Sequence, residues 1–105
     1  MFASTENKGF QVTFANGYTI SCQFGASNYC DHYGRHLQPD YIYKEEMRKP
    51  IHSCANCEVA IWKKGTKKWV TMEVMEALGE EIGEDVAACV TPDEVAKIIA
   101  YLVAL

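Results

Sequence analysis

The fold is decided by residues 9–24, which read GFQVTFANGYTISCQF. Apolar and polar residues alternate on both sides of Asn16-Gly17, and this pattern predicts two half-buried strands joined by a tight turn. A three-residue loop with Gly17 in the left-handed conformation pairs Phe14 with Tyr18 and puts every apolar side chain of the hairpin on one face. A two-residue turn would divide these side chains between both faces, so we expect the three-residue loop.

A second hairpin is predicted from Cys57 to Met72, with its turn at Gly65-Thr66. Glycine in the first position of a two-residue turn suits the type II′ geometry. That register places Trp62 opposite Trp69, as a cross-strand aromatic pair on one face. The opposite face is expected in the core and consists of Val59, Ile61, Val70 and Met72. The tip carries four lysines, Lys63, Lys64, Lys67 and Lys68.

The C-terminal segment carries the signals of a helix start. Thr91 is a good N-cap, Pro92 suits the first helical position, and Glu94 stands where a capping box needs it. Apolar residues then recur at helical spacing, which predicts a stripe that covers a sheet face. This stripe consists of Val95, Ile98, Ile99 and Leu102.

Weaker patterns predict a short helix in residues 72–78 that ends at Gly79, a fifth strand in 85–90, and a helix in 40–49 that Pro50 closes. Together these elements predict an α+β fold. We expect an antiparallel sheet of four or five strands, built from two hairpins, with one main C-terminal helix packed on one face.

Composition limits the class of protein. The chain has 105 residues, of which 49% are hydrophobic and 23% charged, so we expect residues 1–105 to form a single α+β domain. The longest apolar run, Ile98 to Leu105, is too short to cross a membrane, and residues 1–10 lack the apolar run of a signal peptide. A net charge of −4 argues against general DNA or RNA binding. We also expect a homodimer, because pairing of exposed strand edges hides unpaired backbone groups.

Residues 25–56 form a long connection that carries all three histidines and four of the six tyrosines. Binding residues often lie on such loops above a rigid sheet, although tyrosines and histidines also serve simply to cover a sheet face. A surface of aromatic rings and a cation holds a nucleotide by stacking and by neutralising its phosphate, and the same residue types dominate protein interfaces. The candidate contact residues for a ligand or a partner are Tyr29, His32, Arg35, Trp62 and Trp69.

The five cysteines allow other functions. An odd number without a secretory signal indicates reduced thiols. Cys54 and Cys57 have the spacing of two zinc ligands, and Cys30 with His36 would complete a tetrahedral site in a zinc-stabilised interaction module. The motif precedes a strand rather than a helix, which disfavours a thioredoxin-like redox site. A catalytic Cys30 activated by a histidine is a third alternative.

Several stretches resemble a group of small proteins encoded by bacteriophages and prophages, mostly without an assigned activity. The similar stretches are Gly9–Gly17, Ser21–Gly25, Asn28–Cys30 and Cys57–Trp62. The resemblance implies a non-enzymatic viral accessory protein in the cytoplasm of a bacterial host. Such a protein would bind a host defence protein or sequester a signalling nucleotide, without a cofactor. In the pattern of this group, Cys54 or Cys57 need not be cysteine, which weakens the zinc hypothesis.

Overall fold

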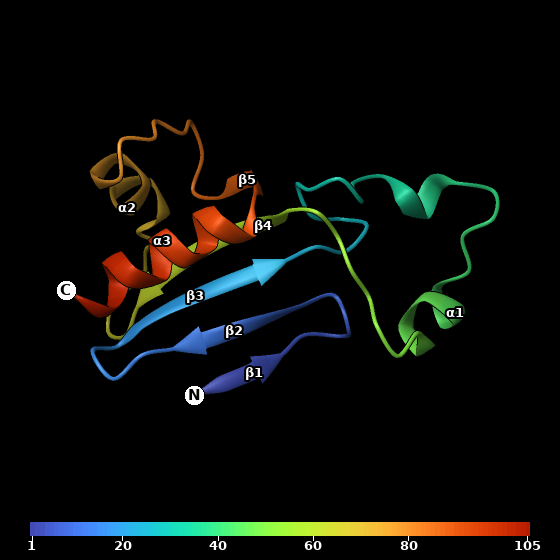
Figure 1. Cartoon of the computed structure of the whole chain (residues 1–105), viewed down its shortest axis with the longest axis horizontal. Coiled ribbons are helices and arrows are strands. Elements are labelled where there is room, and N and C mark those ends of the chain that lie inside the picture. Colours follow the sequence, from blue (N-terminus) through green and yellow to red (C-terminus); the bar gives the residue numbers. More distant parts are fainter.

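Five strands form one antiparallel sheet in which the spatial order follows the chain, β1-β2-β3-β4-β5. The computed structural model describes residues 1–105 (Figure 1). The strands are β1 (Phe2–Ser4), β2 (Gly9–Thr13), β3 (Tyr18–Gln23), β4 (Cys57–Lys63) and β5 (Ala87–Val90). The helices are α1 (Tyr43–Arg48), α2 (Thr71–Ala77) and α3 (Pro92–Val103), with a 3₁₀ turn η1 (Arg35–Leu37). The predicted fold class is confirmed.

The hairpin of β2 and β3 has the predicted register. Phe10 lies opposite Cys22, and Val12 lies opposite Ile20. The Phe14 N–H donates to the carbonyl of Tyr18 at 2.9 Å, and Gly17 has a φ of 90°, which is the left-handed region that a side chain disfavours. The three-residue loop therefore puts Ile20 and Cys22 into the core, as alternation requires.

The second predicted hairpin is wrong, because the returning strand does not form. After the lysine tip, the Val70 N–H donates to the Ile61 carbonyl at 2.8 Å, and α2 begins at the next residue, Thr71. The buried Thr71 hydroxyl accepts the Ile61 N–H at 2.9 Å, so it replaces the strand partner on that side of β4. The partner of Val59 is Ala87 of β5 rather than the predicted Met72.

Strand β1 was not predicted. It pairs with β2, with Phe2 opposite Val12, and forms the free edge of the sheet. The turn between the two strands places Glu6 and Asn7 at φ values of 45° and 56°. Glutamate is uncommon in that region, so residues 5–8 carry no recognisable turn signal.

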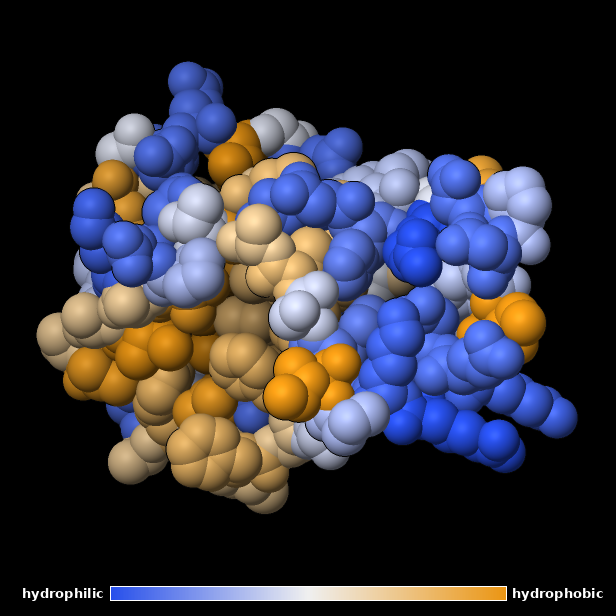
Figure 2. Space-filling view, turned by 45° about the vertical axis from the view of Figure 1, so that its right-hand side comes forward, coloured by the Kyte–Doolittle hydropathy of each residue, from blue (hydrophilic) through white to orange (hydrophobic).

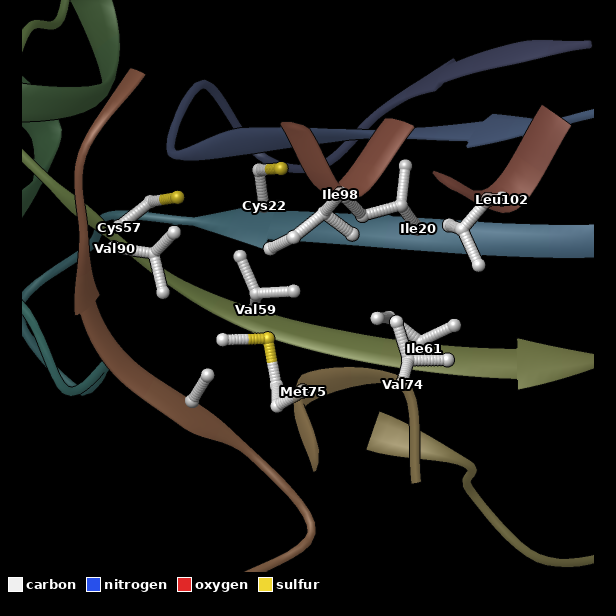
Figure 3. Close-up of a cluster of buried hydrophobic side chains, with 11 residues drawn as sticks. Ile20, Cys22, Cys57, Val59, Ile61, Val74, Met75, Val90, Ile98 and Leu102 are labelled. Carbon is white, nitrogen blue, oxygen red and sulfur yellow. The ribbon is translucent and has the colours of Figure 1, made fainter. Parts of the chain in front are cut away.

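The core lies between the sheet and the two helices α2 and α3, which cover the same face (Figure 3). The Thr91 hydroxyl accepts the Glu94 N–H and the capping box is complete, so α3 begins as predicted. Ile98 and Leu102 of α3 are buried against the sheet. The predicted short helix before Gly79 and the fifth strand are present as α2 and β5. No helix covers the opposite face, which we call the outer face.

Residues 25–56 form a lobe beyond the end of the sheet, on the right of Figure 1. It contains η1 and α1, and α1 confirms the helix predicted in residues 40–49. The Glu58 carboxylate on β4 accepts the Asn28 side-chain amide at 3.2 Å and the Tyr29 N–H at 2.9 Å, which attaches the lobe to the sheet end. No helix in the chain has the length and apolar composition needed to cross a membrane.

Candidate functional site

An open groove of about 560 Å³ runs along the outer face of the sheet. Its floor comes from residues of β3 and β4 that alternate with core residues. It extends from Trp62, whose strand partner is Thr19, to the pair Gln23 and Glu58. These pairs lie four positions apart, so they are separated by roughly 13 Å along the strands. The residues that line the groove include Lys8, Gln11, Ser21, Gln23, Trp62 and Trp69.

Trp62 and Trp69 stack at one end of this groove. Their ring centroids lie 6.1 Å apart with 28° between the ring planes, so the predicted aromatic pair forms although the predicted strand does not. Trp69 is 43% exposed and Trp62 is partly buried. Thr19, across from Trp62, is buried although no helix covers it, so neighbouring side chains exclude water there. The pair therefore offers the exposed indole of Trp69, stacked on Trp62 of β4.

The lysine tip next to the tryptophan pair carries unpaired cations, although Lys63 itself faces the helix side of the sheet, opposite Tyr18. The four tip lysines are exposed, and none of them lies within ion-pair distance of a carboxylate. Lys63 lies over the Tyr18 ring at 5.1 Å, while Lys67 and Lys68 directly precede Trp69. At the far end of the groove, Lys8 is paired with Glu6 at 3.4 Å. Of the two ends of the groove, only the tryptophan end lies next to lysines that form no ion pair, in a chain that is acidic overall.

The other groove side chains largely satisfy one another. The Gln23 amide donates to the Ser21 hydroxyl at 3.1 Å, and the Thr5 hydroxyl donates to the Gln23 side-chain oxygen at 2.8 Å. The Thr13 and Thr19 hydroxyls form a further hydrogen bond of 2.9 Å. The alternation of the first hairpin predicted that its second face is polar. It did not predict that residues 25–56 leave this face open, because that depends on where the lobe folds.

The five predicted contact residues do not form one surface. The Tyr29 ring packs against that of Tyr33 with centroids 5.3 Å apart and 43° between the ring planes, and the Tyr29 carbonyl accepts the N–H of Cys89 in β5. His32 and Arg35 line a separate cavity inside the lobe. The prediction grouped residues by chemical type, and the structure brings together only Trp62 and Trp69. The lobe lies beyond the sheet end, and none of its residues lines the groove that contains the tryptophans.

The four predicted zinc ligands lie in different surroundings. Cys57 faces the core, where a hydrogen bond with Cys22 raises its pKa. Cys30 lies next to Cys54, while His36 lines the lobe cavity. No group of three or more histidine, cysteine or acidic side chains converges as a metal-binding cluster.

Cys30 is buried within the lobe, with 5% of its surface exposed, and its thiol points to the Gly25 carbonyl at 3.7 Å. Burial raises the pKa of Cys30 to about 11, so the thiol stays protonated at neutral pH. Because the thiolate is the reactive form, this environment is unfavourable for a nucleophile.

The molecule thus has two distinct polar cavities, one on the outer face beside the tryptophans and one in the lobe. The outer groove presents exposed aromatic surface, and the exposed Lys67 and Lys68 directly precede Trp69 in the chain. An aromatic surface with a cation nearby is an arrangement that holds a nucleotide base and its phosphate. No protein-family model, no curated protein and no solved structure matches this chain, so its function is inferred from the geometry of its own residues.

Proposed function

We propose that this chain is a non-enzymatic accessory protein of the phage type that sequesters a signalling nucleotide in the cytoplasm of a bacterial host. The base stacks on Trp62 and Trp69, and the phosphate lies against the tip lysines. The observation that supports this proposal is the partly exposed tryptophan stack at the end of an open groove, with the exposed Lys67 and Lys68 directly before Trp69 in the chain.

The expected energies suit a small ligand better than a long nucleic acid. Stacking on an aromatic side chain contributes roughly 1–3 kcal/mol per base, and the lysines add a salt-dependent attraction. The chain carries a net charge of −4, and its acidic residues are concentrated after residue 71. That distribution opposes a long polyanion beyond the tip, while a ligand confined to the tryptophan end meets mainly positive charge.

Intrinsic fluorescence tests this proposal directly, because the chain has only two tryptophans and both lie in the proposed site. The purified protein is titrated with AMP, ATP and a cyclic dinucleotide, and calorimetry supplies an independent Kd. We expect saturable quenching with at least one of them, and weaker binding at high salt. Trp69→Ala should weaken binding about tenfold, which corresponds to about 1.4 kcal/mol of stacking.

Two variants serve as controls. Trp69→Phe keeps an aromatic face and should bind nearly as well as the unchanged protein. Tyr33→Ala removes an exposed aromatic ring of the lobe and should leave binding unchanged. Absence of quenching by every nucleotide would contradict the nucleotide proposal and favour the other partner class, a host defence protein that docks on the same tryptophans.

The alternative function, a zinc-stabilised interaction module, has a separate test. Cys54 neighbours Cys30 and shares a pocket with Cys57. Cys57, however, hydrogen-bonds to Cys22, and His36 lines the separate lobe cavity, from which it would have to move to join the cysteines. Native mass spectrometry of the protein purified under reducing conditions measures this directly. One zinc per chain would support the module, while the bare mass would leave the thiols as packing residues.

A further inference from the structure

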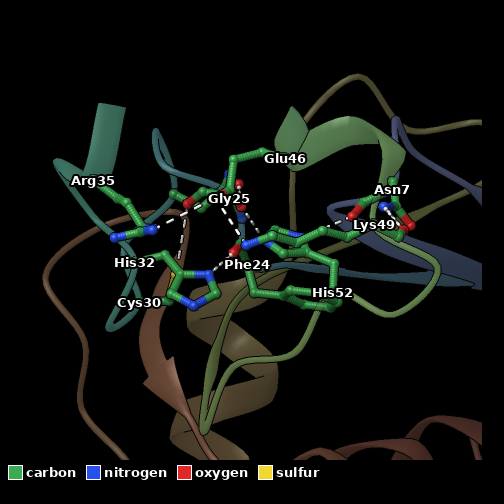
Figure 4. A network of polar contacts seen from close by, with 10 residues as sticks. Asn7, Phe24, Gly25, Cys30, His32, Arg35, Glu46, Lys49 and His52 are labelled. Carbon is green, nitrogen blue, oxygen red and sulfur yellow. Dashed lines mark hydrogen bonds and ion pairs between the residues drawn. The ribbon is translucent and has the colours of Figure 1, made fainter. Parts of the chain in front are cut away.

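The second polar cavity lies where the lobe folds back on the sheet end, and its volume is about 130 Å³ (Figure 4). Three separate stretches build it: the β1–β2 turn, the start of the connection, and the segment from η1 to the residues after α1. Figure 2 shows mainly hydrophilic colours over this side of the molecule. The lining side chains that are cationic or become cationic on protonation are Lys8, His32, Arg35, His36 and His52.

Two acids contact these cationic groups. Glu6 pairs with Lys8 at 3.4 Å, and the second acid, Glu46, lines the cavity and is already neutralised. Its carboxylate contacts Lys49 Nζ at 2.9 Å and Arg35 Nη2 at 3.5 Å, and His52 Nε2 lies 3.9 Å away. The hydrogen bond from Lys49 and the charges of Lys49 and Arg35 lower the pKa of this buried carboxyl, so it stays ionised. Glu46 therefore holds Arg35 in place without cancelling the positive charge of the cavity.

The cationic groups retain unused hydrogen-bond donors. A guanidinium has five N–H donors, and Arg35 uses one of them, in a long contact with Glu46. The His36 ring has no hydrogen-bond partner within the chain, and His32 uses only Nδ1, which lies 2.8 Å from the Phe24 carbonyl oxygen. The two imidazoles of His32 and His52 stack at 5.1 Å and form a rigid wall.

We propose that this cavity binds a phosphate group, either the free anion or the terminal phosphate of a small monoester. The Arg35 guanidinium supplies a bidentate contact, and the His36 ring supplies a further donor. Lys8 is paired with Glu6 and adds only the ammonium N–H donors that this pairing leaves unused. The Ser27 hydroxyl also lines the cavity. A volume of about 130 Å³ gives room for a tetrahedral oxyanion, but a nucleoside would have to remain outside.

The inference is independent of the nucleotide proposal, because no tryptophan lines this cavity. The test is a titration of ¹⁵N-labelled protein with inorganic phosphate and, separately, with ribose 5-phosphate. We expect saturable shifts of the His32, Arg35 and Ser27 resonances with both ligands. Tighter binding of ribose 5-phosphate would indicate a monoester as the ligand, and equal affinity would indicate free phosphate.

Two substitutions with the same charge change test the site. Arg35→Gln should weaken phosphate binding at least tenfold. Arg48→Gln removes an exposed arginine of the same lobe that lies outside the cavity, and should change affinity less than twofold. Because Arg35→Gln also removes a contact of Glu46, His36→Gln is measured as well. It breaks no hydrogen bond within the chain and should weaken binding severalfold with an unchanged spectrum of the free protein.

Two results would overturn the proposal. One is the absence of saturable shifts in the cavity with both ligands at millimolar concentration. The other is equal loss of affinity in Arg35→Gln and Arg48→Gln, which would indicate only a general attraction of anions by the lobe. Trp69→Ala should keep its phosphate affinity, so failure of the nucleotide proposal and failure of this one remain distinguishable.

Discussion

Glu46 is an acidic residue that the lobe removes almost completely from water, with 7% of its surface exposed. Burial of a carboxylate is unfavourable unless cations accompany it, and here Lys49 and Arg35 do so. Since both cations are themselves partly exposed, solvent screens part of the attraction. Glu46 is therefore the residue that links α1, η1 and the segment after α1 into one unit.

Glu46→Gln should lower the free energy of unfolding by about 1 kcal/mol at pH 7, a value reduced for solvent screening of the two cations. The pKa of Glu46 is lower in the folded chain than its ordinary value of 4.5. Its ionisation therefore stabilises the fold above that value, and the stabilisation is lost as the pH falls through the lowered pKa. Urea unfolding of both proteins at pH 7 and at about pH 3 measures this, and we expect the difference to shrink at the lower pH.

Glu45→Gln is the matched control, because Glu45 is exposed on the same helix and forms no ion pair. It should leave the unfolding energy nearly unchanged at both pH values. If Glu46→Gln behaved like this control, the ion pairs of the lobe would have no measurable effect on stability.

At the scale of elements, the contrast between the two hairpins shows what local sequence determines. In the first, Asn16-Gly17 and the long alternation agree on one register, so the prediction was correct. After the tip, the strand pattern covers only Trp69 to Met72, while the following residues are strong helix formers. The helix also buries Val74 and Met75, which a strand would have left outside the core.

The junction between β4 and α2 depends on Thr71. Its hydroxyl accepts the Ile61 N–H at 2.9 Å, and the residue is completely buried. Thr71→Val keeps the shape but leaves that N–H without an acceptor, so we expect a loss of about 1–3 kcal/mol in chemical denaturation. Thr71→Ser retains the hydroxyl and should lose less, by removal of one methyl group alone. Equal stability of the Val variant and the unchanged protein would mean that another group replaces the hydroxyl.

At the scale of the whole molecule, the sequence predicted the two-layer architecture and the capped α3, because both follow from local periodicity and capping. It did not predict where residues 25–56 would fold, since that depends on long-range contacts such as those of Glu58 with Asn28 and Tyr29. For the same reason, the sequence identified His32, Arg35, Trp62 and Trp69 as candidates but could not divide them between two cavities.

Strand β1 forms a free edge of the sheet, and this edge can pair with a second copy of the chain. The strand reads Phe2-Ala3-Ser4, with no lysine, proline or bulge to discourage pairing, and Phe2 is 85% exposed. Phe10 lies beside it on the helix side of the sheet and is also exposed, and apolar colours gather on the left of Figure 2. Antiparallel pairing of β1 with β1 of a second copy, about a two-fold axis, would satisfy both edges and cover these rings.

We therefore expect a concentration-dependent homodimer in sedimentation velocity, and Phe2→Lys should shift it to the monomer by placing like charges across the axis. Leu37→Lys is the control, because Leu37 is 77% exposed on η1 in the lobe, far from β1. It introduces the same charge and should leave the dimer intact. If both substitutions weakened the dimer equally, net charge rather than the β1 edge would govern association. If the unchanged protein were a monomer at every concentration, an edge strand of three residues would be too short to hold two copies together.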